Sequence, residues 1–106
     1  PTDTLGVLQD THWSGAAFGY FPSYTLGAIY ASQFYQTLLK DKPQLEKIIE
    51  SGNLAIIREW LKQKIHKKGR LLSVSDLVKE VTGEGLNPNV FLKYLKQKYR
   101  KIYRFN

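Results

Sequence analysis

The distribution of positive charge constrains the fold of this chain more than any other feature of its sequence. All sixteen Lys and Arg residues of the 106-residue chain lie in residues 40–106, and residues 1–39 contain none. The same first part holds eight of the fourteen aromatic residues and two acidic ones, Asp3 and Asp10. Because a segment that is aromatic and almost free of charge is typical of buried structure, we expect the two parts to have different roles.

Helical spacing dominates the rest of the pattern, and it predicts an all-α fold. Residues 22–40 are apolar on nearly every side of a helix that Pro22 suits as a start, which is typical of a helix enclosed by a larger structure. Four shorter amphipathic helices follow. The first runs from Pro43 to about Ser51, and the second from the N-cap Asn53 to Gly69. The third runs from Asp76 to Val81, with Ser75 as N-cap and Gly83 beyond its end, and the fourth begins after the N-cap Asn87.

Less regular structure is expected in two places. A short helical turn is predicted around Thr4–Gln9, followed by an irregular or extended segment over residues 11–20, where glycines interrupt the pattern. Arg70–Val74 is the one short run with β-like composition.

The composition narrows the possible chemistry. With no cysteine, the chain can form neither a disulfide nor a thiolate metal site. His12 and His66 lie 54 positions apart, and neither belongs to a His-Glu-x-x-His pattern, so we expect no catalytic metal site in this chain alone. No apolar run or leader pattern indicates a membrane or secretion, which makes a cytoplasmic location the default. Since the chain has no methionine and begins at Pro1, we expect a fragment or a processed product.

Two motifs in the first part of the chain resemble those of a known family. They are Gly6-x-x-Gln9-Asp10-x-His12-Trp13 and Gly19-Tyr20-Phe21-Pro22-Ser23-Tyr24-Thr25-Leu26-Gly27. Both are similar to signatures of the carboxypeptidase Taq family, the thermostable-type metallocarboxypeptidases of bacteria and archaea. The family usually has Thr at the position of Ser23, which keeps the hydroxyl. Further similar segments follow in the same order, around Trp60–Gly69, Thr82–Glu84 and Tyr94–Tyr103.

The resemblance implies the C-terminal helical segment of a larger, mostly helical zinc peptidase. Residues 1–106 would form one segment, with an active-site wall and a buried helix in residues 1–41 and amphipathic basic helices in residues 42–106. The family's His-Glu-x-x-His helix, its third zinc ligand and its substrate-binding Arg motif lie N-terminal to the matching segment. The intact enzyme would be a homodimer that uses zinc, or another divalent metal, and a glutamate base to activate water against the last peptide bond.

The resemblance also assigns roles to single residues. His12 and Tyr24 would be catalytic, stabilising the reacting carbonyl or holding the peptide, because oxyanions need hydrogen-bond donors. Gln9, Asp10 and Tyr20 would contact the substrate, and Gln9 or Asp10 could instead orient His12, with which Asp10 is expected to pair. No metal ligand is assigned. The fragment alone is expected to be inactive and to associate with the missing N-terminal part of the same protein, or with itself, through its exposed aromatic surface.

Each assignment has a simpler structural alternative. A buried His usually just finds partners, and Gln or Asp in a turn often bonds only to the backbone. The aromatic residues Trp13, Phe18 and Phe21 are expected mainly to pack, and His66 to favour a helix end. The lysines and tyrosines of the C-terminal part keep a helical nucleic-acid or protein-interaction module as the alternative function. Their separation onto opposite helix faces argues against nucleic acid, because such a charge run is usually a solvated face.

Overall fold

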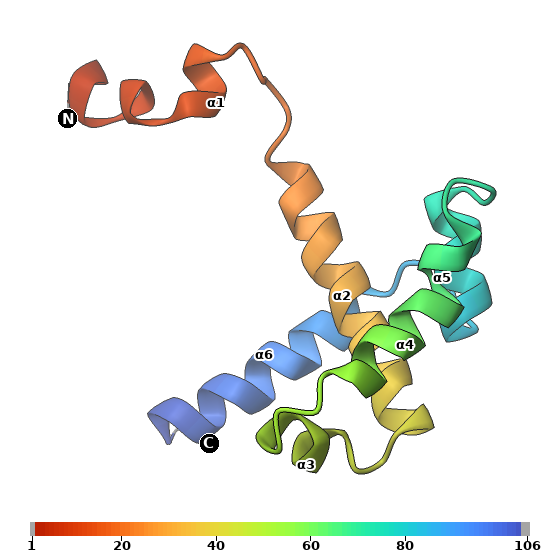
Figure 1. The fold of residues 1–106 in the computed structure, drawn as a ribbon. Coiled ribbons are helices and arrows are strands. Elements are labelled where there is room, and N and C mark those ends of the chain that lie inside the picture. Colours follow the sequence, from red (N-terminus) through yellow and green to blue (C-terminus); the bar gives the residue numbers. More distant parts are fainter. Residues whose placement is uncertain (1, 105–106) are drawn as a thin grey trace.

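The computed structural model describes residues 2–104, which are helical with no β-strand (Figure 1). An N-terminal arm, residues 2–20, contains two 3₁₀ turns, η1 (Asp3–Leu5) and η2 (Val7–Gln9), and the single-turn helix α1 (Thr11–Ser14). Figure 1 shows that this arm stands away from the other helices. The remaining helices are α2 (Pro22–Asp41), α3 (Leu45–Glu50), α4 (Ala55–Lys64), the turn η3 (His66–Lys68), α5 (Val74–Thr82) and α6 (Pro88–Tyr103).

The all-α prediction and most helix positions are confirmed. Pro22 occupies the first turn of α2, and Asn87 caps α6 by accepting a hydrogen bond from the Asn89 N–H (3.1 Å). Gly83 follows α5 in the left-handed conformation (φ 84°), which glycine adopts without steric cost.

Two predicted caps and one predicted segment are wrong in detail. Ser73, not Ser75, caps α5, because that register places Asp76 where both its backbone N–H and its carboxylate bond to the Ser73 hydroxyl. Asn53 does not cap α4: its N–H bonds to the Ile48 carbonyl (3.2 Å) and closes the turn after α3, so Leu54 holds the cap position. Residues 11–14 are helical rather than irregular or extended. Residues 70–74, the run with β-like composition, form no strand, in agreement with the all-α prediction.

The core lies where α2, α3, α4 and α5 meet. Leu38, Leu45, Trp60 and Val81 are buried together, and the Trp60 Nε1–H donates to Asp41 Oδ2 (2.8 Å) at the end of α2. Burying these apolar side chains removes them from water, and the indole hydrogen bond satisfies the one polar atom of Trp60.

Gln33 joins α2 to the turn before α6. Its side chain is 1% exposed, its Nε2 donates to the Gly85 carbonyl (2.9 Å), and its Oε1 accepts from the Asn87 N–H (3.1 Å). Both ends of the amide are therefore satisfied by backbone groups 52 and 54 positions away. The second half of α2 is thus fixed in the helical body, while its first turns lead to the arm (Figure 1).

The first half of α2 is much less covered. The buried residues of α2 are Ile29, Gln33 and Leu38, whereas Tyr24 and Leu26 are 56% and 40% exposed. The sequence predicts a helix enclosed on nearly all sides, and within this chain the burial begins only at Ile29.

Candidate functional site

The site is built on one hydrogen-bonded turn of the arm. Asp10 has extended backbone geometry and precedes α1, and its Oδ1 accepts from the His12 backbone N–H (2.7 Å). A carboxylate at this position satisfies a helix N–H that has no partner within the helix. The same Oδ1 lies 3.1 Å from His12 Nδ1, so one oxygen fixes both the backbone and the ring of His12. The predicted pairing of Asp10 and His12 is confirmed, although it arises from a helix cap and not from an extended segment.

The other side of the His12 ring meets the beginning of α2. His12 Nε2 lies 3.0 Å from the Tyr24 hydroxyl, which joins the two residues across twelve positions of sequence. The imidazole stacks on Tyr20 (centroids 5.6 Å apart, planes at 19°) and lies against Phe21 at 5.2 Å. His12 is therefore held by both nitrogens and covered by two rings.

The pKa of the Asp10 carboxyl is displaced from its usual value. Partial burial raises the pKa of Asp10, but the hydrogen bonds from His12 and from the Trp13 backbone, with the charge of His12, outweigh this and lower it below the usual value. Hydrogen bonds to the charged form favour ionisation, so Asp10 is a carboxylate at neutral pH.

The remaining predicted site residues are placed differently. Gln9, in η2, donates from Nε2 to the carbonyl of Thr4 in η1 (2.6 Å) rather than to His12. Tyr20 lies next to His12 and edge-on to Tyr24 at 5.3 Å, with half of its surface exposed. Of the five, the structure thus brings together Asp10, His12, Tyr20 and Tyr24 and leaves Gln9 apart.

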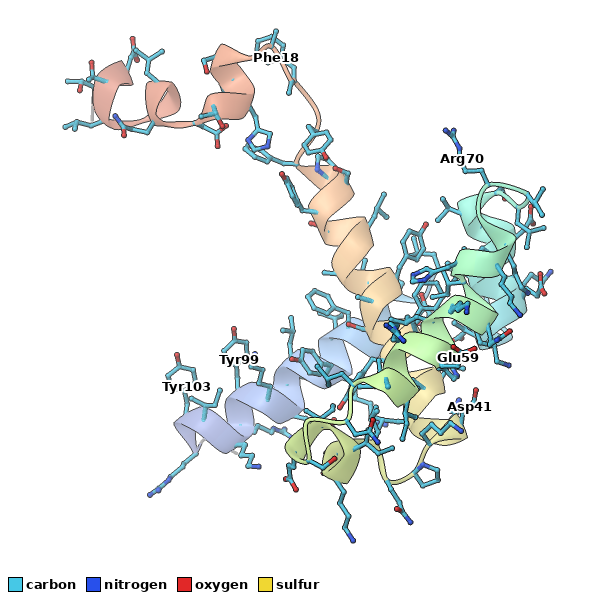
Figure 2. All side chains as sticks on the ribbon, viewed as in Figure 1. Phe18, Asp41, Glu59, Arg70, Tyr99 and Tyr103 are labelled. Carbon is cyan, nitrogen blue, oxygen red and sulfur yellow. The ribbon has the colours of Figure 1, made fainter. Side chains whose placement is uncertain are left out.

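The aromatic residues of the arm form a surface that is open within this chain. Trp13 packs edge-on against Phe18 at 5.4 Å, yet they are 43% and 69% exposed. Figure 2 shows Phe18 on the arm, far from the helical body. An arrangement of fixed donors on an aromatic surface suits a polar group of a ligand with apolar neighbours.

Neither a cluster of metal-ligating side chains nor a membrane-spanning helix occurs in the described part of the chain. Within residues 2–104, no three His, Cys, Asp or Glu side chains gather closely enough to hold a metal ion. No helix among these residues is both long and apolar enough to cross a lipid bilayer.

Comparison with protein families decides the relationship that the two motifs indicate. Residues 1–99 match the family model described as carboxypeptidase Taq (M32) metallopeptidase. The chain belongs to this family.

Relatives in the carboxypeptidase Taq family are much longer than this chain. "Carboxypeptidase 1" of Bacillus subtilis (strain 168) is 44% identical over 96% of the chain, and "Thermostable carboxypeptidase 1" of Thermus thermophilus is 42% identical over 92%. The chain spans about one fifth of the length of each, at 20% and 19%.

Solved structures agree with the fold. One described as "BsuCP Crystal Structure" superimposes with a TM-score of 0.86 at 44% identity, over 94% of this chain and 20% of the other. A second, "The Structure of CHT", gives 0.83 at 47% identity, over 92% and 20%.

Phe21 contacts His12, although the sequence assigned it mainly to packing. Its ring lies 5.2 Å from the imidazole and 6.4 Å from Tyr24. The signal was its position in the second family motif, between Tyr20 and Tyr24, both of which were assigned to the site.

Proposed function

We propose that this chain forms one wall of the active site of a metal-dependent carboxypeptidase, which releases C-terminal amino acids from peptides with zinc-activated water. The observation that carries this proposal is the 3.0 Å contact between His12 Nε2 and the Tyr24 hydroxyl. It joins the two family motifs at a single point, next to a carboxylate that fixes the ring. Such geometry suits a reaction better than it suits packing, because the side chains are only partly covered here.

The chemistry of peptide hydrolysis explains what this wall would supply. Attack on the last peptide bond turns its carbonyl oxygen into an oxyanion, which preorganised hydrogen-bond donors stabilise. We assign this role to the pair His12 and Tyr24. Tyr20 and Asp10 are adjacent to the pair and fit the predicted contacts or supports, and Gln9 remains a predicted substrate contact.

The metal belongs elsewhere in this proposal. The described residues do not fit a zinc site, since no three suitable side chains come together. The ligands of zinc, or of another divalent metal, and the general base would then lie in the other four fifths of the parent enzyme. We expect this chain alone to be inactive.

The same missing part would cover the surfaces that this chain leaves open. An apolar groove of about 700 Å³ runs between α2 and α6, lined by Ala28, Ala31, Tyr35, Leu39, Phe91 and Tyr94 among others. Most of this chain, 94%, superimposes with a TM-score of 0.86 on a solved chain about five times as long, which supports covering by the remainder of that chain. We propose that residues 1–41 form the covered wall and residues 42–106 the solvent-facing helices of one segment near the C-terminus of the parent.

The parent enzyme tests the proposal directly. Tyr24→Phe removes only the hydroxyl, and we expect kcat for a peptide with a free C-terminus to fall by about 10²–10³, the typical loss of one oxyanion donor. Tyr35→Phe, on the same helix but in the groove, is the matched control and should retain activity. An amidated peptide should not be cleaved, and chelation should abolish activity that added zinc restores. If the chelated parent stayed fully active, the metal-dependent mechanism would be wrong.

Family membership favours the peptidase over a nucleic-acid or protein-interaction module. A homodimeric parent and a cytoplasmic location are part of the proposal, and sedimentation and cell fractionation of the parent would check them.

A further inference from the structure

Both ring nitrogens of His12 are already used inside the chain. Nδ1 lies 3.1 Å from Asp10 Oδ1 and Nε2 lies 3.0 Å from the Tyr24 hydroxyl. Tyr20 and Phe21 cover the ring. The His12 side chain is 32% exposed, whereas Tyr24 is 56% exposed. His12 therefore has no spare donor for a ligand unless one of these bonds breaks. Of the three hydrogen-bonded residues Asp10, His12 and Tyr24, Tyr24 is the one that a ligand can reach.

The direction of the two hydrogen bonds follows from proton counting. A carboxylate only accepts, so His12 Nδ1 must donate to Asp10. In the neutral imidazole Nε2 then has no proton, and the Tyr24 hydroxyl donates to it. In this state the hydroxyl proton of Tyr24 points toward His12 and is not available to a ligand. When His12 gains a second proton at Nε2, that nitrogen donates to the Tyr24 oxygen, and the hydroxyl proton becomes available to an acceptor outside.

We propose that Tyr24 alone contacts the substrate carbonyl, and that doubly protonated His12, held by Asp10, acts through it by turning the hydroxyl proton outward. Asp10 and His12 are then positioning residues. This assignment of roles rests on the proposed function, because it says which residue of that site contacts the substrate and which residues position it. No proton leaves the three residues during the reorientation.

Few titratable groups face His12. Those in the described chain are Asp10 on the turn before α1, and Tyr20 and Tyr24 at the start of α2. Neither η2 nor the loop over residues 15–19 adds a titratable group. Asp3 in η1 is the other acidic residue of the arm, and residues 1–39 hold no Lys or Arg. The outward donor is present only while Nε2 of His12 carries a proton.

A double-mutant cycle in the full-length parent enzyme tests whether His12 acts through Tyr24. We expect Tyr24→Phe to lower kcat/KM by about 10²–10³, and His12→Gln in the Tyr24→Phe background to cost no more than about twofold further. A further loss of about tenfold or more in that background would show that His12 contacts the reacting group by itself, and would overturn the proposal. The wild-type pH profile should have an alkaline limb that both single variants lack.

The conservative variants of Asp10 separate a positioning role from loss of folding. Asp10→Glu should keep part of the alkaline limb, and Asp10→Asn, which can still cap α1, should shift it toward lower pH with unchanged KM. An unshifted limb in Asp10→Asn would contradict the role of the carboxylate.

A readout independent of activity keeps this inference separate from the proposed function. Nitrogen-15 NMR of the parent with labelled histidine, with His12→Gln to assign the ring, should show the neutral form protonated at Nδ1. A neutral form protonated at Nε2 would refute the proposed direction of the bonds. If the parent cleaved no peptide while Nδ1 of His12 was the protonated nitrogen, the proposed function would be wrong. The inferred direction of the two hydrogen bonds of His12 would still be correct.

Discussion

Replacing the buried amide of Gln33 should loosen the connection between α2 and the turn before α6. Gln33→Met keeps a similar side-chain volume, so it opens no large cavity, but it leaves the Gly85 carbonyl and the Asn87 N–H without their partner. Each unsatisfied buried group costs about 1–3 kcal/mol. Gly85 is exposed and Asn87 half-buried, so water can replace part of the loss, and we expect a total of about 2 kcal/mol rather than the full sum.

The expected free-energy loss converts into a measurable exchange rate. At about 1.4 kcal/mol per tenfold, a loss of about 2 kcal/mol raises the opening equilibrium of this turn roughly thirtyfold. Hydrogen exchange followed by mass spectrometry on the parent protein would report it in peptides that contain residues 83–92. Gln63→Met, at an exposed position of α4, is the control and should leave these peptides unchanged. Unchanged exchange at residues 83–92 in Gln33→Met would refute the reasoning that this amide joins the two segments.

Three further predictions concern the arm, the core and the groove. The folded-state pKa of Asp10 lies below its usual value, so its bonds to α1 are complete above about pH 4 and are lost as pH falls through the folded-state pKa. NMR of the His12 backbone amide should follow this loss, and Asp10→Asn should abolish the pH dependence of the amide signal. Trp60→Phe removes the hydrogen bond to Asp41 and should lower stability by about 1–2 kcal/mol, measured by thermal unfolding of the parent. Ala31→Arg should lower the melting temperature of the parent by several degrees if the rest of the enzyme fills the groove, and should leave it unchanged if the groove stays open to water.

Short-range signals made most of the helices predictable. Asn87 followed by Pro88 marks a helix start through two local effects, a side-chain acceptor and a preset backbone angle, and neither depends on the rest of the fold. The choice between Ser73 and Ser75 was harder, since both have the required hydroxyl. Only the buried face of α5, with Val78 and Val81, selects the register, and that face is set by packing against other helices.

The candidate site was predictable as a set of residues but not as a set of contacts. Asp10 and His12 are two positions apart, so their pairing followed from local geometry. The bond from His12 to Tyr24 crosses residues 15–21, where the path of the chain includes Ala16 and Gly19 with positive φ angles of 56° and 74°. Sequence patterns do not specify such a path, so only the structure could show that the Tyr24 hydroxyl meets the second nitrogen of His12.

The position of Tyr24 depends on contacts at both ends of α2. Tyr24 lies nine residues before Gln33, which at 1.5 Å per residue places it about 13.5 Å along the axis from the hydrogen bonds that join α2 to the turn before α6. On the other side, the arm meets it through His12 and the Tyr20 ring. A catalytic group must be held to within about 0.5 Å of its productive position, and one anchored end with an exposed half does not provide this. If Tyr24 is the donor that we propose, the packing that fixes it comes from outside this chain, and the isolated segment should position the Tyr24 hydroxyl less precisely than the parent does.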